Sequence, residues 1–144
     1  MLAPEKIVET LGGVQKLKRT AGSWDGLHKL ILGGLPFSTY THVLAAFKLT
    51  ASEAFVIFQI PARTLARRRE TRRLRPDESD RVFRFARIAA RASDVLGSEE
   101  KAGIWLHRPN RALGNKPPIT LLGTDAGIEQ TEIVLGRLEH GVYS

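Results

Sequence analysis

Residues 50–73 read TASEAFVIFQIPARTLARRRETRR, and this stretch predicts two short helices separated by a tight break. Thr50 followed three residues later by Glu53 is a capping-box pattern, in which the hydroxyl accepts a backbone N–H and the carboxylate reaches back. Pro61 lacks a backbone N–H and suits the first position of a helix. We therefore expect helices over 51–58 and 62–71, which together predict a helix-turn-helix unit.

The second helix of this pair is dense in arginine. We expect its face opposite Leu65 to enter the major groove of DNA, where an arginine can make two hydrogen bonds to a guanine edge. The residues expected on that face are Arg63, Thr64, Arg67 and Arg68. The arginines farther along are expected to meet phosphates, which position a protein without reading sequence; they are Arg69, Arg72 and Arg73. Thr50, at the start of the first helix, is expected beside another phosphate.

Charge is unevenly distributed along the chain. Residues 1–91 hold 17 Lys and Arg against 8 Asp and Glu, whereas residues 92–144 hold 5 against 7. A basic block in a chain of pI about 10.2 is typical of proteins that bind a polyanion. The alternative is a helical bundle with a basic outer face that binds nothing.

The rest of the sequence also predicts helices, so we expect an all-α fold. Apolar spacing, proline and glycine punctuation and capping residues place these helices over 4–11, 25–32 (capped by Asp25), 36–47, 77–96 (ending at Gly97), 98–107 (capped by Ser98) and 128–140, with a single helical turn over 119–122. Three parts are expected. They are an N-terminal helical segment of unassigned role over 1–34, a helix-turn-helix domain with its connecting helix over 35–91, and a small helical C-terminal domain over 92–144.

Aromatic residues are numerous in the middle of the chain. Phe37, Phe47, Phe55 and Phe58 exceed what one small helix-turn-helix core needs, so we expect some of them at an interface. Helix-turn-helix proteins usually read paired half-sites, which predicts a homodimer.

Catalytic chemistry is not expected. The chain has no cysteine, and its four histidines are scattered singly without metal-ligand spacing. No phosphate-binding glycine loop or nucleophile motif is present, so we expect no enzyme activity, no cofactor and no metal. With no signal-peptide pattern and no long apolar run, a cytoplasmic protein without a membrane contact is expected.

The last forty residues resemble a known family. The residues that carry the resemblance are Trp105-Leu106, Pro109-Asn110, Leu113-Gly114, Pro118–Leu122, Thr124, Gly127, Leu135, Arg137-Leu138 and Gly141. This pattern is similar to the toxin-binding domain of the Xre/MbcA/ParS antitoxins. Ile60–Arg69 resembles the second helix of that family's helix-turn-helix, and Leu74–Ser79 followed by Arg81 resembles its linker. The resemblance covers about residues 35–144.

This resemblance implies an antitoxin of a type II toxin–antitoxin system. Such proteins pair with RES-domain toxins that degrade NAD, cover the toxin's active site with their C-terminal region, and bind operator DNA to repress their own operon. Carried onto this chain, the toxin-facing residues are Arg137, His140, Gly141, Val142, Tyr143 and Ser144. A short tail after Gly141 agrees with entry into a pocket. The alternatives are a stand-alone helix-turn-helix regulator and a polar-localisation adaptor.

Overall fold

The computed structural model describes residues 2–17 and 22–141. Within these residues the chain is built from helices and contains two isolated antiparallel bridges, Pro36 with Arg73 and Asn110 with Lys116, but no strand. The all-α prediction is therefore confirmed. The helices are α1 (Pro4–Thr10), α2 (Gly13–Leu17), α3 (Trp24–Gly33), α4 (Phe37–Ala46), α5 (Ala51–Phe58), α6 (Ala62–Thr71), α7 (Pro76–Leu96), α8 (Glu99–His107), η1 (Arg111–Leu113), η2 (Pro118–Leu121) and α9 (Asp125–Glu139).

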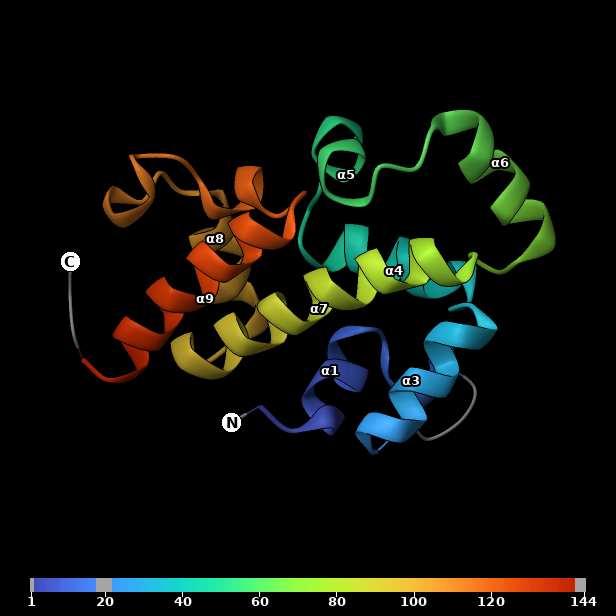
Figure 1. The fold of residues 1–144 in the computed structure, drawn as a ribbon, viewed down its shortest axis with the longest axis horizontal. Helices are drawn as coiled ribbons and strands as arrows, with labels where there is room; N and C mark the ends of the chain where they lie inside the picture. The colour runs from blue at the N-terminus through green and yellow to red at the C-terminus, as the bar shows by residue number, and fades with distance from the viewer. Residues whose placement is uncertain (1, 18–21, 142–144) are drawn as a thin grey trace.

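Helix α7 is the central element on which the other parts pack. It crosses the middle of the molecule, with α1 and α3 on one side, α6 near its N-terminal end and α8 and α9 near its C-terminal end (Figure 1). Its buried stripe includes Val82, Phe85, Ile88, Ala89 and Ala92, as the periodicity predicts. It ends at Gly97, whose φ of 103° suits a residue without a side chain. The boundary expected at residue 91 thus falls inside a continuous helix.

Aromatic rings form the centre of the core beside α7. Phe85 makes edge-to-face contacts with Phe58 and Phe47 at centroid distances of 5.6 and 5.5 Å, and Phe58 contacts Tyr40 at 5.4 Å. Burial raises the pKa of the Tyr40 phenol. These phenylalanines therefore serve the internal core, whereas Phe55 is 56% exposed.

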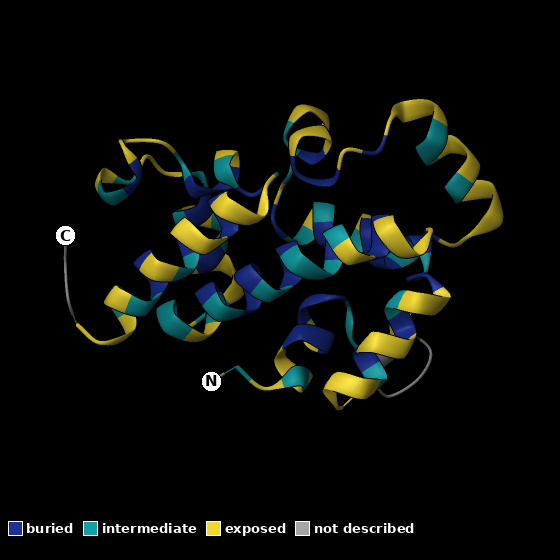
Figure 2. Ribbon diagram, viewed as in Figure 1, coloured by how far each residue is buried: buried dark blue, intermediate teal, exposed yellow. Residues whose placement is uncertain are grey.

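The N-terminal segment belongs to the same core. Ile7 and Leu11 at the α1 end and Leu27 and Leu30 of α3 are buried, and Figure 2 shows the inward faces of these helices dark blue. Helix α2 occupies part of residues 14–23, a stretch for which the sequence predicts no definite element. The described residues among 1–34 therefore contribute to the core of the fold.

Hydrogen bonds at helix starts confirm some predicted caps and correct others. Thr50 and Glu53 form the predicted capping box, with N···O distances of 2.9 and 3.1 Å, and Ser98 caps α8. Ser23, not Asp25, caps α3, because its hydroxyl accepts the Gly26 N–H at 3.0 Å. Pro61 is the N-cap of α6 rather than its first residue.

The start of α9 is the largest error of the sequence-based assignment. The helix begins at Asp125, three residues before the predicted Ile128, because the Thr124 hydroxyl accepts the Gly127 N–H at 3.0 Å. Gly127 reads as a break in the sequence but lies in the first turn of the helix. No helix of the described residues is long and apolar enough to cross a membrane.

Candidate functional surfaces

Helices α5 and α6 are joined by a turn of three residues that contains no glycine. Gln59 takes the left-handed conformation, with φ of 55°, where helix-turn-helix proteins often carry glycine. Its side-chain amide donates to the Gly123 carbonyl at 3.2 Å, and Ile60 is buried behind it. The turn is therefore stabilised by the C-terminal part of the chain.

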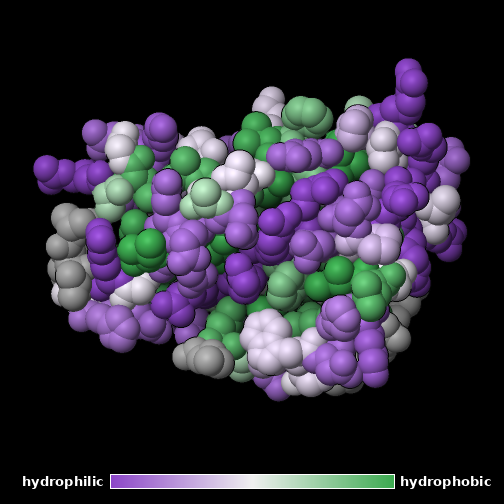
Figure 3. Space-filling model, viewed as in Figure 1, coloured by the Kyte–Doolittle hydropathy of each residue, from purple (hydrophilic) through white to green (hydrophobic). Residues whose placement is uncertain are grey.

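Helix α6 lies on the surface and presents several arginines to solvent. None of its residues is fully buried, and hydrophilic side chains gather over it in Figure 3. Arg63 and Arg67 are exposed, and neither forms an ion pair with an acid among the described residues. Thr64 and Arg68, expected on the same face, are both half-buried: Thr64 accepts a hydrogen bond from Arg67 Nη2 at 3.4 Å, whereas Arg68 donates to Glu78.

Arg68 is engaged inside the protein. Its Nε and Nη2 donate to the two carboxylate oxygens of Glu78 at 2.8 and 3.1 Å, and the two side chains are only 16% and 6% exposed. Burial alone raises the pKa of Glu78, but the bonds from Arg68 and from the Arg75 N–H outweigh it and lower that pKa overall. Arg68 therefore anchors α6 to the start of α7.

Arg73 is also held within the fold. Its Nη1 donates to the carbonyls of Gly34 and Gly33 at 2.7 and 3.3 Å. The neighbouring backbone is tied as well, since the Leu74 N–H donates to the Leu35 carbonyl at 2.9 Å and the Phe37 N–H donates to the Arg72 carbonyl at 3.0 Å. The C-terminal end of α6 is thus fixed to the segment between α3 and α4.

Arg69 and Arg72 remain directed to the surface. The Arg69 guanidinium lies over the Phe37 ring, 5.1 Å from its centroid, and Arg72 is exposed in a left-handed conformation at the end of α6. We call the four exposed arginines around this helix the α6 basic face, although they project from more than one side of it; they are Arg63, Arg67, Arg69 and Arg72.

Thr50 is used by its own helix. Its hydroxyl and its N–H both bond to Glu53, and this carboxylate carries negative charge at the same helix start. Burial raises the pKa of Glu53, but hydrogen bonds from Thr50 and from His107 offset this effect and lower that pKa overall. The start of α5 is therefore a poor place for a phosphate.

The outer side of α9 is the second exposed surface. Ile133 is 49% exposed, and Arg137 and His140 are exposed toward the end of the helix. Gly141 follows with φ of 72°, as expected for a residue that ends a helix. The predicted residues Val142, Tyr143 and Ser144 lie outside the described residues. The sequence analysis did not predict Ile133 as a surface residue. The pattern that could have indicated it is an aliphatic residue four positions before Arg137, on an otherwise polar face of the helix.

Ion pairs fix α9 against α7. Arg91 pairs with Glu132 at 2.6 Å and with Glu139 at 3.1 Å, so one half-buried guanidinium holds two turns of α9. Glu78 and Arg91, which anchor α6 and α9, are thirteen residues apart on α7. This separation corresponds to about 20 Å along the helix axis. The α6 basic face and the end of α9 therefore lie at opposite ends of the molecule (Figure 1).

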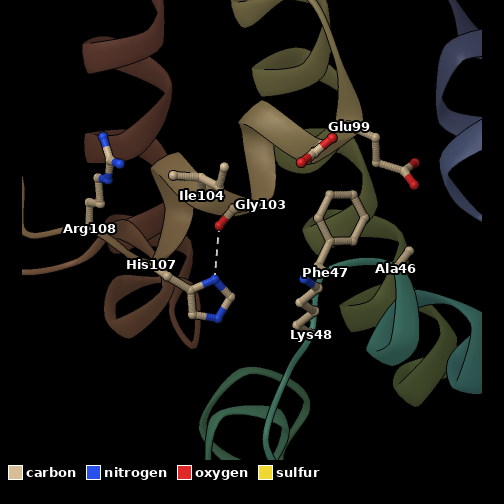
Figure 4. A pocket seen from close by; sticks show the side chains of 9 residues that line it. Ala46, Phe47, Lys48, Glu99, Gly103, Ile104, His107 and Arg108 are labelled. Carbon is tan, nitrogen blue, oxygen red and sulfur yellow. Dashed lines mark hydrogen bonds between the residues drawn. The ribbon is translucent and has the colours of Figure 1, made fainter.

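A groove of about 680 Å³ lies between the end of α4 and one side of α8. Figure 4 shows Phe47 and Ile104 on its walls, with Glu99 at one end and His107 and Lys48 at the other. Sequence reasoning missed this groove because its two walls are about fifty residues apart in the chain.

Comparison with known proteins identifies both parts of the chain. Residues 26–87 match the antitoxin Xre-like helix-turn-helix domain, and residues 91–141 match the antitoxin Xre/MbcA/ParS C-terminal toxin-binding domain. A relative from Photorhabdus laumondii named antitoxin Xre is 31% identical over 134 residues, which are 89% of this chain and 90% of the relative.

Two further relatives carry the same name. The one from Yersinia enterocolitica is 42% identical over 87 residues, 59% of each chain. The one from Pseudomonas putida is 41% identical over 83 residues, 57% of this chain and 52% of the relative. These two alignments thus span less than two thirds of the relatives' length, whereas the first spans nearly all of it. The chain therefore belongs to the Xre/MbcA/ParS antitoxin family: it is a non-enzymatic protein of a toxin–antitoxin system, with a DNA-binding helix-turn-helix domain and a toxin-binding domain.

Proposed function

We propose that this antitoxin neutralises a RES-domain toxin that degrades NAD, by covering the toxin's active site with its C-terminal region, and that it represses its own operon. The observation that carries the proposal is the toxin-binding domain over 91–141, whose last helix leaves Ile133, Arg137 and His140 exposed in a row toward its end. A stand-alone regulator does not account for a toxin-binding domain. Imaging tests the alternative of a polar-localisation adaptor, because a diffuse signal argues against that role.

The toxin's identity is testable in cells. Expression of the reading frame beside this gene is expected to stop growth and deplete NAD, and co-expression of the antitoxin is expected to restore both. Growth arrest with a normal NAD level would exclude the RES assignment while leaving the antitoxin role intact. A neighbour that is harmless when expressed alone would remove the proposed partner.

For DNA, we divide the arginines by their exposure and by their partners within the fold. Arg63 and Arg67 are exposed on α6 and suit base edges in the major groove. Arg69 and Arg72 suit phosphates on either side of that groove. Arg68 and Arg73 have partners inside the fold, so we assign them to holding α6 in place.

We expect Arg67→Ala to weaken binding to the operator more than binding to unrelated DNA. Loss of a two-bond contact to guanine costs about 1–3 kcal/mol of discrimination. Arg72→Ala is expected to weaken binding to every sequence and to lower the slope of log affinity against log salt by about 1. Titrations of both variants with operator and random duplexes at two salt concentrations measure this difference. Identical behaviour of the two variants would contradict the division between base and phosphate contacts.

On the toxin side, we expect removal of residues 142–144 to abolish neutralisation while operator affinity stays unchanged. The removed residues would contact the toxin's active site, so their loss removes the inhibition. Operator affinity is unaffected because α6, which would contact DNA, lies at the other end of α7 from α9. Growth rescue in the toxin co-expression assay and gel-shift affinity measure the two activities. Full rescue by the shortened protein would contradict occlusion by the tail, and Ile133→Glu then tests whether α9 itself covers the toxin.

A homodimer follows from paired operator half-sites, and we propose one for this antitoxin. Two copies of the α6 basic face would then occupy successive turns of the major groove on one side of the duplex.

A further inference from the structure

The groove between α4 and α8 has a composition that marks it as a binding surface. Its floor is apolar, formed by Ala46, the buried Phe47 and the backbone of Gly103, and Ile104 is 46% exposed along its wall (Figure 4). A single exposed isoleucine on a convex surface needs no explanation. Here the isoleucine lies in a hollow over further apolar groups, where a partner's side chain can bury it.

Opposite charges lie at the two ends of this groove. Glu99 and Glu100 lie at the start of α8, and Lys48 and Arg108 lie near its end together with His107. Such an arrangement favours one orientation of an incoming segment and disfavours the reverse. It fits a segment with an apolar side chain between a basic group, which would face the glutamates, and an acidic group, which would face Lys48 and Arg108.

The wall formed by α8 is held in place before any partner binds. His107 contacts the Gly103 carbonyl through Nδ1 at 2.9 Å and the Glu53 carboxylate through Nε2 at 3.4 Å. Ala102 and Leu106, on the other side of α8, are buried in the core. A rigid wall loses little entropy when a partner binds.

The two walls of the groove come from different domains. Helix α8 belongs to the toxin-binding domain, whereas residues 46–48 belong to the helix-turn-helix domain. We propose that a segment of the toxin occupies this groove, so that the toxin contacts the helix-turn-helix domain as well as the C-terminal domain. The proposal rests on the antitoxin function proposed above. We assign the toxin as its occupant because α8, which forms one wall of the groove, lies within the residues that match the toxin-binding domain.

The contact also reaches the first helix of the DNA-binding unit. Glu53, which His107 contacts, forms the capping box that starts α5. A toxin segment that contacted His107 would therefore be separated from the start of α5 only by the His107 and Glu53 side chains.

Three variants test the proposal by isothermal titration against the toxin in a catalytically inactive form. Ile104→Glu, which places a charge on the apolar wall, is expected to weaken binding about a hundredfold, the effect of losing a buried interface anchor. Lys48→Glu, in the other domain, is expected to weaken it about tenfold at low salt and less at high salt. Leu32→Glu is the control, because Leu32 is an aliphatic residue of α3 that is also exposed, at 59%, and lies outside the groove. It is expected to bind the toxin as the unmodified protein does.

Circular dichroism melts of each variant establish that it is folded. If Lys48→Glu binds the toxin with unchanged affinity at low salt, the toxin does not use the helix-turn-helix wall and the inference is wrong. If Ile104→Glu changes the oligomeric state of the free antitoxin but not its toxin affinity, the groove holds a second copy of this chain instead, which also overturns it. If the unmodified protein does not bind the toxin at all, the proposed partner itself is wrong.

Discussion

Replacement of Gly127 by alanine is expected to destabilise the C-terminal domain and to abolish toxin neutralisation at growth temperature. A methyl group there would lie 1.8 Å from the backbone oxygen of Leu121 and 2.7 Å from its carbonyl carbon. Both atoms belong to the backbone of η2, so no side-chain rotation relieves the clash. We expect a loss of about 3 kcal/mol in the free energy of unfolding, the upper range for overpacking. In a chain of this size that loss lowers Tm by about 10 °C.

Gly136→Ala is the matched control in the same helix. A methyl group at Gly136 meets only Arg91 Nη2, at 3.6 Å, which is an ordinary contact. Alanine within a helix is favoured over glycine by about 1 kcal/mol, so this variant is expected to melt at a higher temperature than the unmodified protein. Calorimetric melts are therefore expected to show a lower Tm for Gly127→Ala and a higher Tm for Gly136→Ala than for the unmodified protein. A Gly127→Ala protein as stable as the unmodified one would show that α9 does not pack on η2 as described.

Loss of the Arg68–Glu78 pair is expected to have the next largest effect. Glu78→Gln leaves the Arg68 guanidinium largely buried without a charged partner, and breaking such a pair costs about 3 kcal/mol or more. The same pair positions α6 against α7, so operator affinity is expected to fall although Glu78 does not face DNA. Urea unfolding at pH 7 and gel-shift titration measure the two effects.

The contribution of this pair depends on pH in a direction set by Glu78. Its pKa in the folded protein is lowered from the ordinary 4.5. A carboxylate with a lowered pKa stabilises the folded state above its unfolded pKa, and this contribution disappears as pH falls through the folded value. The stability difference between the unmodified protein and Glu78→Gln is therefore expected to be large at pH 7 and to shrink as the pH is lowered below 4.5.

Asp77→Asn is the control for this experiment. Asp77 is the adjacent acid, but its side chain is 64% exposed and its ion pairs are long, at 3.7 and 3.9 Å. An exposed pair contributes less than about 1 kcal/mol, so this variant is expected to unfold nearly as the unmodified protein does. A Glu78→Gln protein that matched Asp77→Asn at pH 7 would contradict an anchoring role for Arg68.

The features that the sequence predicted correctly depend on residues close together in the chain. Thr50 and Glu53 are three positions apart, Ser98 caps α8 through its own hydroxyl, and Gly97 ends α7 because it has no side chain. The start of α9 was predicted three residues too late, although its cap, Thr124, is as local as the others. The sequence does not show that position 127 requires glycine, because the cause is the Leu121 carbonyl of a separate element. A glycine needed for close packing has the same appearance in a sequence as a glycine that ends a helix.

The roles of the candidate site residues also depend on contacts that the sequence does not show. Arg67 and Arg68 are adjacent and chemically identical, yet one is exposed and the other binds Glu78, ten residues farther along. The groove is equally invisible in the sequence, because Lys48 and Ile104 meet only when α4 and α8 pack together.

By itself, the sequence determined that the chain is helical, where most helices begin and end, and that a basic helix-turn-helix precedes a toxin-binding domain. The helices and their ends follow from hydrophobic periodicity and caps, which act over a few residues, and the basic character follows from the charge of the sequence. The toxin-binding domain follows from the resemblance of its residues to a known family. Only the tertiary structure decided which arginines are free, why position 127 requires glycine, and that two domains share a groove. These outcomes depend on hydrogen bonds, burial and steric contact between segments that only the packing of the helices brings together.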